Sequence, residues 1–89
     1  MVRRTFVIRN RLGLHARAAA QLVQLAADYK SDLVISKDGQ EVNGKSIMGL
    51  MMLAASQGAT IDVEADGPDA EELMKAVEAL IEAKFNESA

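Results

Sequence analysis

The spacing of apolar positions changes from two residues to a helical period within the first third of the chain. Over residues 4–9, Phe6 and Ile8 alternate with the positions between them, and this alternation predicts a strand. Residues 10–14 form a loop, after which the apolar positions fall on one face of a helix predicted over residues 16–30. The apolar stripe of this helix consists of Ala19, Leu22, Val23 and Ala26.

A β-hairpin is expected after this helix. The apolar run over residues 33–35 predicts a strand, but a continuous run does not reveal which of its faces is buried. Asp38 and Gly39 both tolerate a positive φ, so the pair predicts a tight turn. The returning strand is expected over residues 40–42.

The second half of the chain predicts a helix, a strand and a further helix. Ser46 is a natural N-cap for a short helix, Gly49 weakens its middle, and Gly58 is expected just past its end. Residues 60–65 alternate cleanly, which predicts a half-buried strand. Its inward positions are Ile61, Val63 and Ala65.

The last helix is expected to begin near Asp69, after a turn over residues 66–68, with Glu72 completing a capping box. Its apolar stripe consists of Leu73, Ala76, Val77, Leu80 and Ile81. Residues 86–89 are expected to fray. The predicted order is β-α-β-β-α-β-α, so we expect an α+β fold in which three helices cover one face of a mostly antiparallel, four-stranded sheet.

Length and composition restrict the class of protein. A chain of 89 residues predicts one domain over residues 1–89, and 49% hydrophobic residues suffice for its core. With no cysteine and one histidine, we expect no disulfide, no metal site and no other cofactor. No apolar run approaches the ~20 residues that span a membrane, and the N-terminus lacks the apolar core of a signal peptide. We therefore expect a cytoplasmic monomer that does not insert into membranes.

Charge is spread unevenly, although the net charge is only −3. Arginines gather in the first third of the chain and carboxylates in the last third, which gives the domain a basic end and an acidic end. The basic end includes His15 and would attract a phosphate or an acidic partner. A small nucleic-acid-binding domain is a remote alternative, because only 3% of the residues are aromatic and bases would find little to stack on. Filter binding at low salt distinguishes the two.

The single histidine lies where the loop becomes the first helix, in the segment Gly13-Leu14-His15-Ala16-Arg17. The first N–H groups of a helix have no partner inside it and carry a partial positive charge, so they would receive an anion attached to His15. Arg17 adds a planar guanidinium group. The same positive groups disfavour imidazolium and leave a nitrogen lone pair to attack phosphorus. This pattern indicates a phosphoryl carrier, and the alternative is a surface histidine that only caps the helix.

Residues 47–53 are apolar almost all round the second predicted helix, whereas a surface helix needs only one apolar stripe. Exposed Ile and Met side chains there predict an adaptable docking surface, and the alternative is a helix buried on most sides. A phosphate on Ser46 would sit on helix amides and change the charge beside that surface. Ser46 is therefore a candidate for regulatory phosphorylation as well as an N-cap.

Residues 39–46 match the spacing of a nucleotide-binding Walker A loop. Such a loop must be free to wrap phosphates, and it needs a parallel sheet and a second acidic strand that holds magnesium. Here the middle of the segment is expected to be a hairpin strand. We therefore do not expect ATP hydrolysis, and calorimetry with nucleotide tests this expectation.

The His15 segment and the segment Asn43-Gly44-Lys45-Ser46-Ile47-Met48-Gly49 together resemble HPr, the histidine-containing phosphocarrier family of the phosphoenolpyruvate-dependent phosphotransferase system. The resemblance covers essentially the whole chain and implies an open-faced β-sandwich. It also implies that His15 accepts a phosphoryl group on Nδ1 from phosphorylated enzyme I and passes it to an enzyme IIA domain. The protein would then be a co-substrate, without enzymatic activity of its own.

The resemblance also implies roles for other residues. Arg17 corresponds to the arginine that helps to hold the phosphate. Ser46 corresponds to the serine that an ATP-dependent HPr kinase/phosphorylase modifies, which hinders transfer to His15. The positions at which the family docks its partners are Ile47, Met48 and Met51. An alternative within the same family is a regulatory protein-binding module of the nitrogen-related branch, which does not transport sugar.

One position departs from the family pattern. The family usually has proline after the arginine of the site, and this chain has Ala18. Proline fixes φ and has no N–H, so alanine adds one amide donor and loses some rigidity. We expect Ala18 to leave transfer intact while altering local order or phosphate affinity.

Overall fold

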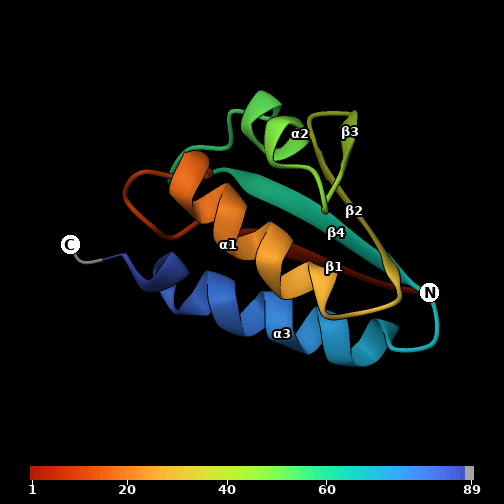
Figure 1. The fold of residues 1–89 in the computed structure, drawn as a ribbon. Helices are drawn as coiled ribbons and strands as arrows, with labels where there is room; N and C mark the ends of the chain where they lie inside the picture. The colour runs from red at the N-terminus through yellow and green to blue at the C-terminus, as the bar shows by residue number, and fades with distance from the viewer. Residues whose placement is uncertain (88–89) are drawn as a thin grey trace.

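The computed structural model describes residues 1–87, and the elements follow the order expected from the sequence (Figure 1). The strands are β1 (Val2–Val7), β2 (Asp32–Lys37), β3 (Gln40–Asn43) and β4 (Thr60–Asp66). The helices are α1 (Ala16–Ala27), α2 (Ile47–Met52) and α3 (Ala70–Glu82), and a short turn, η1, covers Lys84–Asn86. None of the helices within residues 1–87 is long and apolar enough to cross a bilayer.

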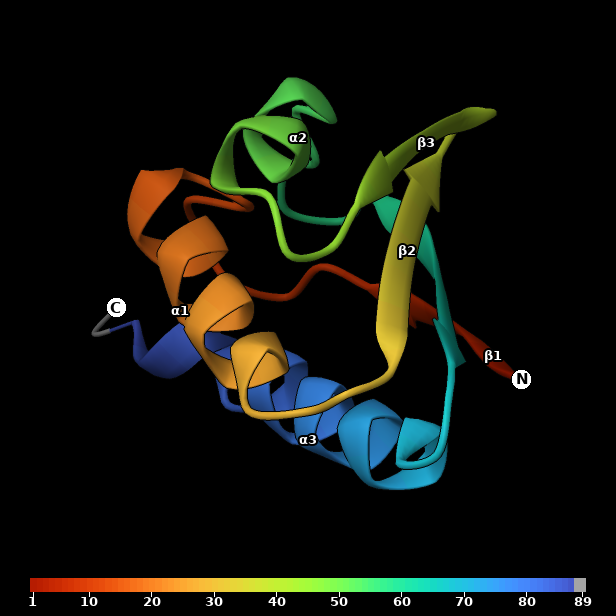
Figure 2. The ribbon, with the colours of Figure 1, turned by 45° about the vertical axis from the view of Figure 1, so that its right-hand side comes forward.

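The strands form one antiparallel sheet in the order β1-β4-β2-β3. The alternation predicted for β4 is confirmed, because its three inward side chains are buried. On β2, Leu33 and Ile35 face the core, which decides the face that the sequence left open. Helices α1 and α3 lie side by side across one face of the sheet, and α2 packs against α1 and β3 (Figures 1 and 2). The predicted α+β architecture is confirmed.

The helix stripes are close to those predicted, with small rotations. In α1, Ala18 is buried together with most of the expected stripe, and Val23 is only half-buried. In α3, Met74 is buried in the core, and two of the predicted positions, Ala76 and Leu80, are half-buried. Both helices therefore present slightly different faces to the sheet than their apolar spacing alone indicates.

Two predicted boundaries, those of the first strand and of the first helix, are wrong. Strand β1 covers Val2–Val7 and is shifted by two residues, and Ile8 bonds instead to the loop before β4. Helix α1 ends at Ala27 and does not extend to Lys30, whose N–H donates to a carboxylate of another element. After Ala27 the amides of Asp28 and Tyr29 bond three residues back, and only the Lys30 amide turns to the carboxylate. The Ile8–Ala59 bond extends the β1–β4 register by one pair.

The end of α2 was also predicted wrongly. The helix ends at Met52, and the left-handed position after it is Ala54, with φ of 50°. Gly58 lies in the loop before β4, where its N–H donates to the Ile8 carbonyl. Glycine is the usual residue at a left-handed helix end, so the sequence favoured Gly58 over Ala54.

The capping box predicted for α3 is absent. Asp69 is the N-cap residue, but its side chain makes no capping bond. Its carboxylate accepts the N–H groups of Lys30 and Ser31, both at 2.9 Å, and the Ser31 hydroxyl at 2.5 Å. These bonds, above all that from the Ser31 hydroxyl, lower the pKa of Asp69 to about 2. Asp69 therefore joins α3 to the end of α1.

The prediction of fraying is wrong for residues 86 and 87, and residues 88–89 lie outside the described part of the chain. Turn η1 buries Phe85 to 2% exposure, and the Asn86 amide donates to Gln21 on α1 at 3.3 Å. Glu87 then reaches the loop before α1. This end of the chain is therefore packed against the histidine loop.

Candidate functional site

His15 is the N-cap residue of α1, as the sequence predicts. Its backbone is extended, its carbonyl accepts the Ala19 N–H at 2.9 Å, and its side chain does not cap the helix. The amides of residues 16–18 precede this first helical bond and are the donors that a helix leaves unpaired. The ring is half-exposed, so it meets solvent at the positive end of the helix.

Gly13 fixes the path of the loop that delivers the ring. Its φ is 66°, and a Cβ at this position would lie 2.3 Å from the Ala55 carbonyl oxygen. The next amide, that of Leu14, donates to the same carbonyl at 2.9 Å, and the Leu14 side chain is buried. Only glycine fits so close an approach at this backbone conformation. The loop is therefore fastened to the segment before β4, one residue before His15.

The ring has one hydrogen-bond contact among residues 1–87. Nδ1 of His15 lies 3.2 Å from the Gly13 carbonyl oxygen. A carbonyl only accepts, so the contact is a hydrogen bond when Nδ1 carries the hydrogen, and the lone pair is then on Nε2. Attack by Nδ1 requires the other tautomer and the loss of this bond.

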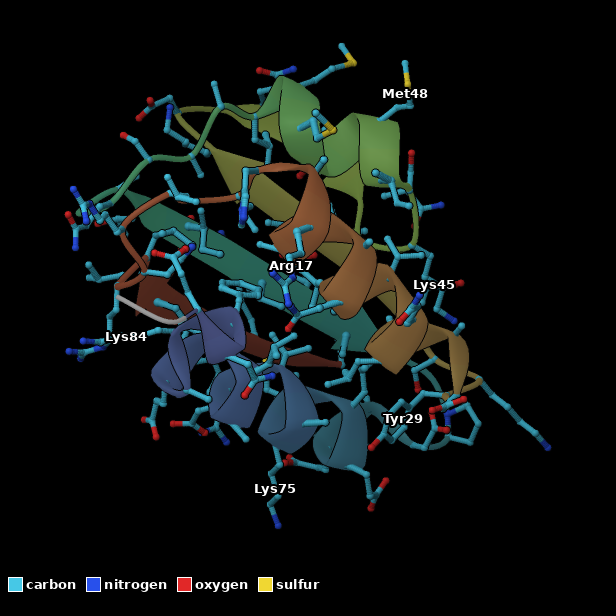
Figure 3. All side chains as sticks on the ribbon, turned by 60° about the vertical axis from the view of Figure 1, so that its left-hand side comes forward. Arg17, Tyr29, Lys45, Met48, Lys75 and Lys84 are labelled. Atoms are coloured by element: carbon cyan, nitrogen blue, oxygen red, sulfur yellow. The ribbon has the colours of Figure 1, made fainter. Side chains whose placement is uncertain are left out.

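His15 borders a cavity of about 240 Å³ between the start of α1 and the end of the described chain. Its walls are Leu12, His15, Arg17, Gln21, Phe85 and Glu87. The Arg17 side chain is exposed and makes no ion pair or hydrogen bond with any other residue from 1 to 87, and Figure 3 shows it on α1 beside the end of α3. The cavity therefore brings the ring and an unpaired guanidinium together at the start of α1, which suits a phosphoryl group, and it also holds the Glu87 carboxylate.

Two further residues, Asn10 and Glu87, belong to this site, and no sequence pattern predicts them. Asn10 is fully buried, and its Nδ2 donates to the Gly13 carbonyl at 2.8 Å and to Glu87 at 3.0 Å. The Glu87 carboxylate also accepts the Leu12 N–H at 3.3 Å. The Asn10 bond is the main cause that lowers the pKa of Glu87 below its usual value. Neither residue belongs to an apolar pattern or a motif, so nothing in the sequence marked them.

Ala18 is completely buried in the first turn of α1. Its amide is one of those that precede the first helical bond, so this chain offers a donor where proline would offer none. The predicted extra donor is thus in the first turn, but it is buried and does not meet solvent.

The second predicted region, on α2, has the geometry expected of it. The Ser46 Oγ accepts the Gly49 N–H at 3.0 Å, which confirms the N-cap. The side chains of Ile47, Met48 and Met51 are 40%, 74% and 45% exposed, and Met48 points away from the molecule in Figure 3. Leu50 alone anchors the helix in the core. Residues 40–43 are strand β3, paired with β2, so the segment with Walker A spacing does not form a phosphate loop.

Comparison with known proteins shows the family to which the chain belongs. The family model described as "PTS HPr component phosphorylation site" matches residues 2–83. The chain belongs to the HPr family of phosphocarrier proteins. It is 52% identical to the phosphocarrier protein HPr of Cupriavidus necator, over 98% of both chains. The crystal structure of HPr-C-His from Thermoanaerobacter tengcongensis superposes with a TM-score of 0.95 at 47% identity, over 100% of both chains.

A relative with a different printed name matches at lower identity. The chain is 39% identical to the phosphocarrier protein NPr of Shewanella violacea, over 96% of this chain and 93% of the relative. Membership in the family gives the chain a phosphocarrier role in the phosphotransferase system and confirms the resemblance drawn from the two sequence segments.

Proposed function

We propose that residues 1–89 form a single carrier domain in which His15 accepts a phosphoryl group from phosphorylated enzyme I and passes it to an enzyme IIA domain. The observation that supports this most directly is the half-exposed His15 ring at the amide end of α1, beside the unpaired Arg17. The ring is accessible to a partner's phosphoryl group, and the positive groups around it can receive the charge.

The transfer step needs no cofactor. The lone pair of a ring nitrogen forms a bond to phosphorus while the bond from phosphorus to the donor breaks. For attack by Nδ1, as in the family, the hydrogen is on Nε2 and stays there, and the bond to the Gly13 carbonyl is lost. The same step in reverse, with the acceptor as nucleophile, discharges the carrier. The protein is consumed and regenerated, and it acts as a co-substrate rather than an enzyme.

Helix α2 and its N-cap are the regions that we propose for partner binding and for regulation. We propose that the exposed side chains of Ile47, Met48 and Met51 bind both enzyme I and enzyme IIA, because α2 packs against α1 and presents flexible apolar contacts close to the site. We propose that HPr kinase/phosphorylase modifies Ser46. A phosphate on the N-cap would add negative charge at the rim of this surface and weaken docking. The carrier is proposed to act as a monomer, which sedimentation analysis checks.

A second candidate function is regulation in the nitrogen-related branch. The specific observation in its favour is the NPr relative at 39% identity. Mixing the phosphorylated protein with enzyme IIA domains of the sugar and nitrogen branches separates the two, because the true acceptor is phosphorylated faster than the other.

The test of the proposed function is incubation with phosphoenolpyruvate and enzyme I, followed by acid treatment of the product. We expect an acid-labile phosphoprotein from the wild type and from the control Ser46→Ala, and none from His15→Ala, whose fold is checked by circular dichroism. Label that persists in His15→Ala, or that survives acid, would contradict the assignment to His15.

A further inference from the structure

Glu87 is connected to His15 by a short series of hydrogen bonds. Its Oε2 accepts Nδ2 of Asn10 at 3.0 Å, the same Nδ2 donates to the Gly13 carbonyl at 2.8 Å, and that carbonyl lies 3.2 Å from Nδ1 of His15. Both Glu87 oxygens also accept the Leu12 N–H, at 3.3 Å. The carboxylate therefore holds the whole histidine loop from one side.

This arrangement is complete only while His15 carries no phosphate on Nδ1. A phosphorylated Nδ1 has no hydrogen to donate, so it cannot bond to the Gly13 carbonyl. The Glu87 carboxylate also borders the cavity beside His15 and Arg17, where the phosphoryl group would lie. Two anions in one cavity repel each other. Both effects favour the unphosphorylated form.

The fold places Glu87 there at some conformational cost. Lys84, Phe85 and Asn86 all have left-handed φ values, of 55°, 53° and 56°. Side-chain-bearing residues rarely adopt this region, and such strain persists where surrounding contacts hold it. Here the buried Phe85 anchors the turn, and the turn directs Glu87 back toward the loop. Asn10 gives its Nδ2 to this network, and its buried Oδ1 has no partner among the described residues.

We propose that Glu87 tunes the phosphoryl-transfer equilibrium: its carboxylate, through Asn10 and by charge, disfavours phosphohistidine at position 15 and so helps the phosphate to leave. The proposal rests on the proposed function of His15 and names a further residue of that site. The N–P bond forms and breaks as described above, and Glu87 takes no part in bond making. When His15 is phosphorylated, the loop bonds of Glu87 weaken and the carboxylate moves away from the cavity.

The test measures the equilibrium between enzyme I and the carrier in Glu87→Gln, which removes the charge but keeps the size of the side chain. We expect the ratio of phosphorylated to free carrier to rise about 5- to 10-fold at fixed enzyme I, because a like charge is removed from the cavity. Glu82→Gln is the matched control. It removes the same charge from an exposed position in α3 outside the cavity and leaves the ratio unchanged.

A second measurement is independent of enzyme I. The wild type is phosphorylated with phosphoramidate, a small chemical donor, and NMR follows the Leu12 amide and the ring nitrogens. We expect phosphate on Nδ1 and a several-fold loss of hydrogen-exchange protection at Leu12, since its bond to Glu87 weakens. An unchanged equilibrium in Glu87→Gln would overturn the proposal, as would an unchanged Leu12 amide in the phosphorylated protein, and phosphate on Nε2 would remove the Asn10 route.

The two proposals fail in different ways. If phosphoramidate labels His15 and the Leu12 amide loses protection, but enzyme I transfers nothing, the proposed function is wrong. The effect of Glu87 on phosphohistidine is then supported by the reaction with phosphoramidate only. If enzyme I transfers normally and Glu87→Gln behaves like Glu82→Gln, the carrier function stands and the role of Glu87 is wrong.

Discussion

At each end of the layer formed by α1 and α3, a carboxylate is hydrogen-bonded to a loop next to α1, but the two contacts differ in strength. At one end Asp69, at the start of α3, binds the loop that follows α1 through Ser31. At the other end Glu87, beyond α3, binds the loop that precedes α1 through Asn10. Among residues 1–87, Asn10 and Ser31 are the buried polar side chains. In each case a carboxylate at one end of α3 accepts a hydrogen bond from a buried polar side chain in a loop beside α1.

The difference between the two ends lies in how well the groups are satisfied. The Ser31 hydroxyl donates to Asp69 and accepts the Asp69 N–H at 3.1 Å, so the pair is reciprocal. At the other end the bonds to Glu87 are longer, and the Asn10 Oδ1 has no partner within residues 1–87. Short, reciprocal hydrogen bonds such as those of Ser31 and Asp69 hold two elements together stably. The longer bonds of Asn10 and Glu87 can break more easily when the neighbouring histidine changes its charge. The Asp69 end therefore suits a purely structural role, and the Glu87 end suits the role in transfer that we propose for it.

The largest expected effect comes from adding one methyl group at each end. A Cβ on Gly67 would lie 2.6 Å from the Ser31 Oγ, and one on Gly13 would lie 2.3 Å from the Ala55 carbonyl oxygen, both at positive φ. We expect Gly67→Ala and Gly13→Ala each to lower the free energy of unfolding by about 2 to 5 kcal/mol, measured by urea denaturation. Only Gly13→Ala should also slow transfer per folded molecule.

Gly58→Ala is the control for backbone strain. Its φ of 90° is also positive, but a Cβ there meets nothing within 4 Å. The expected loss is about 1 to 2 kcal/mol, from the left-handed conformation alone. A loss for Gly58→Ala as large as for the packed glycines would mean that close packing is not what fixes the two ends.

The next effect sharpens the contrast in function. Arg17→Ala removes the guanidinium beside the His15 cavity, so we expect phosphoryl acceptance from enzyme I to slow about tenfold, because one charge-assisted hydrogen bond is lost. Arg4→Ala removes the same charge from an exposed position on β1 and serves as the control. Rapid-quench measurement of labelled carrier gives both rates. Equal slowing by the two variants would show that Arg17 acts only through the net charge of the protein and not through its position beside His15.

Acid tests the structural end. The folded pKa of Asp69 is about 2, below the ordinary value of 3.8, so its bonds stabilise the fold fully above about pH 4. That stability is lost as the pH falls from about 4 toward 2, because the unfolded carboxyl then binds a proton more readily than the folded one. We expect thermal melts of the wild type to fall more steeply across this window than those of Asp69→Ala. Parallel curves would show that the hydrogen bonds of the Asp69 carboxylate contribute no pH-dependent stability.

The sequence predicted the parts of this molecule that follow from a repeated pattern or a local preference. Alternation in β4 and the Asp38–Gly39 turn depend on neighbours in the chain, and both are present. The position of His15 at a helix start is equally local. The Asp69–Ser31 and Glu87–Asn10 contacts join residues 38 and 77 positions apart, and no spacing encodes such pairs.

Local rules also failed where a distant group competed for the same atoms. Asp69 is a residue type that favours helix capping, but its carboxylate accepts the amides of the loop between α1 and β2 instead. Residues 86 and 87 have the sequence of a frayed end, but the burial of Phe85 holds them against α1 and its loop. Local propensity decides an element only where tertiary contacts leave its polar groups free.

The smallest expected effect concerns Ala18, where the chain departs from its family. Ala18→Pro removes one of the unpaired amides at the start of α1 without breaking a helical bond, since the first bond comes from Ala19. Ala18 is completely buried, so its amide does not meet the solvent side where a phosphate on His15 would lie. We expect acceptance to continue and the transfer equilibrium to change by less than about twofold, because proline mainly restricts the backbone at the start of α1. A wild type that accepts no phosphate until proline is restored would contradict its assignment as a working carrier.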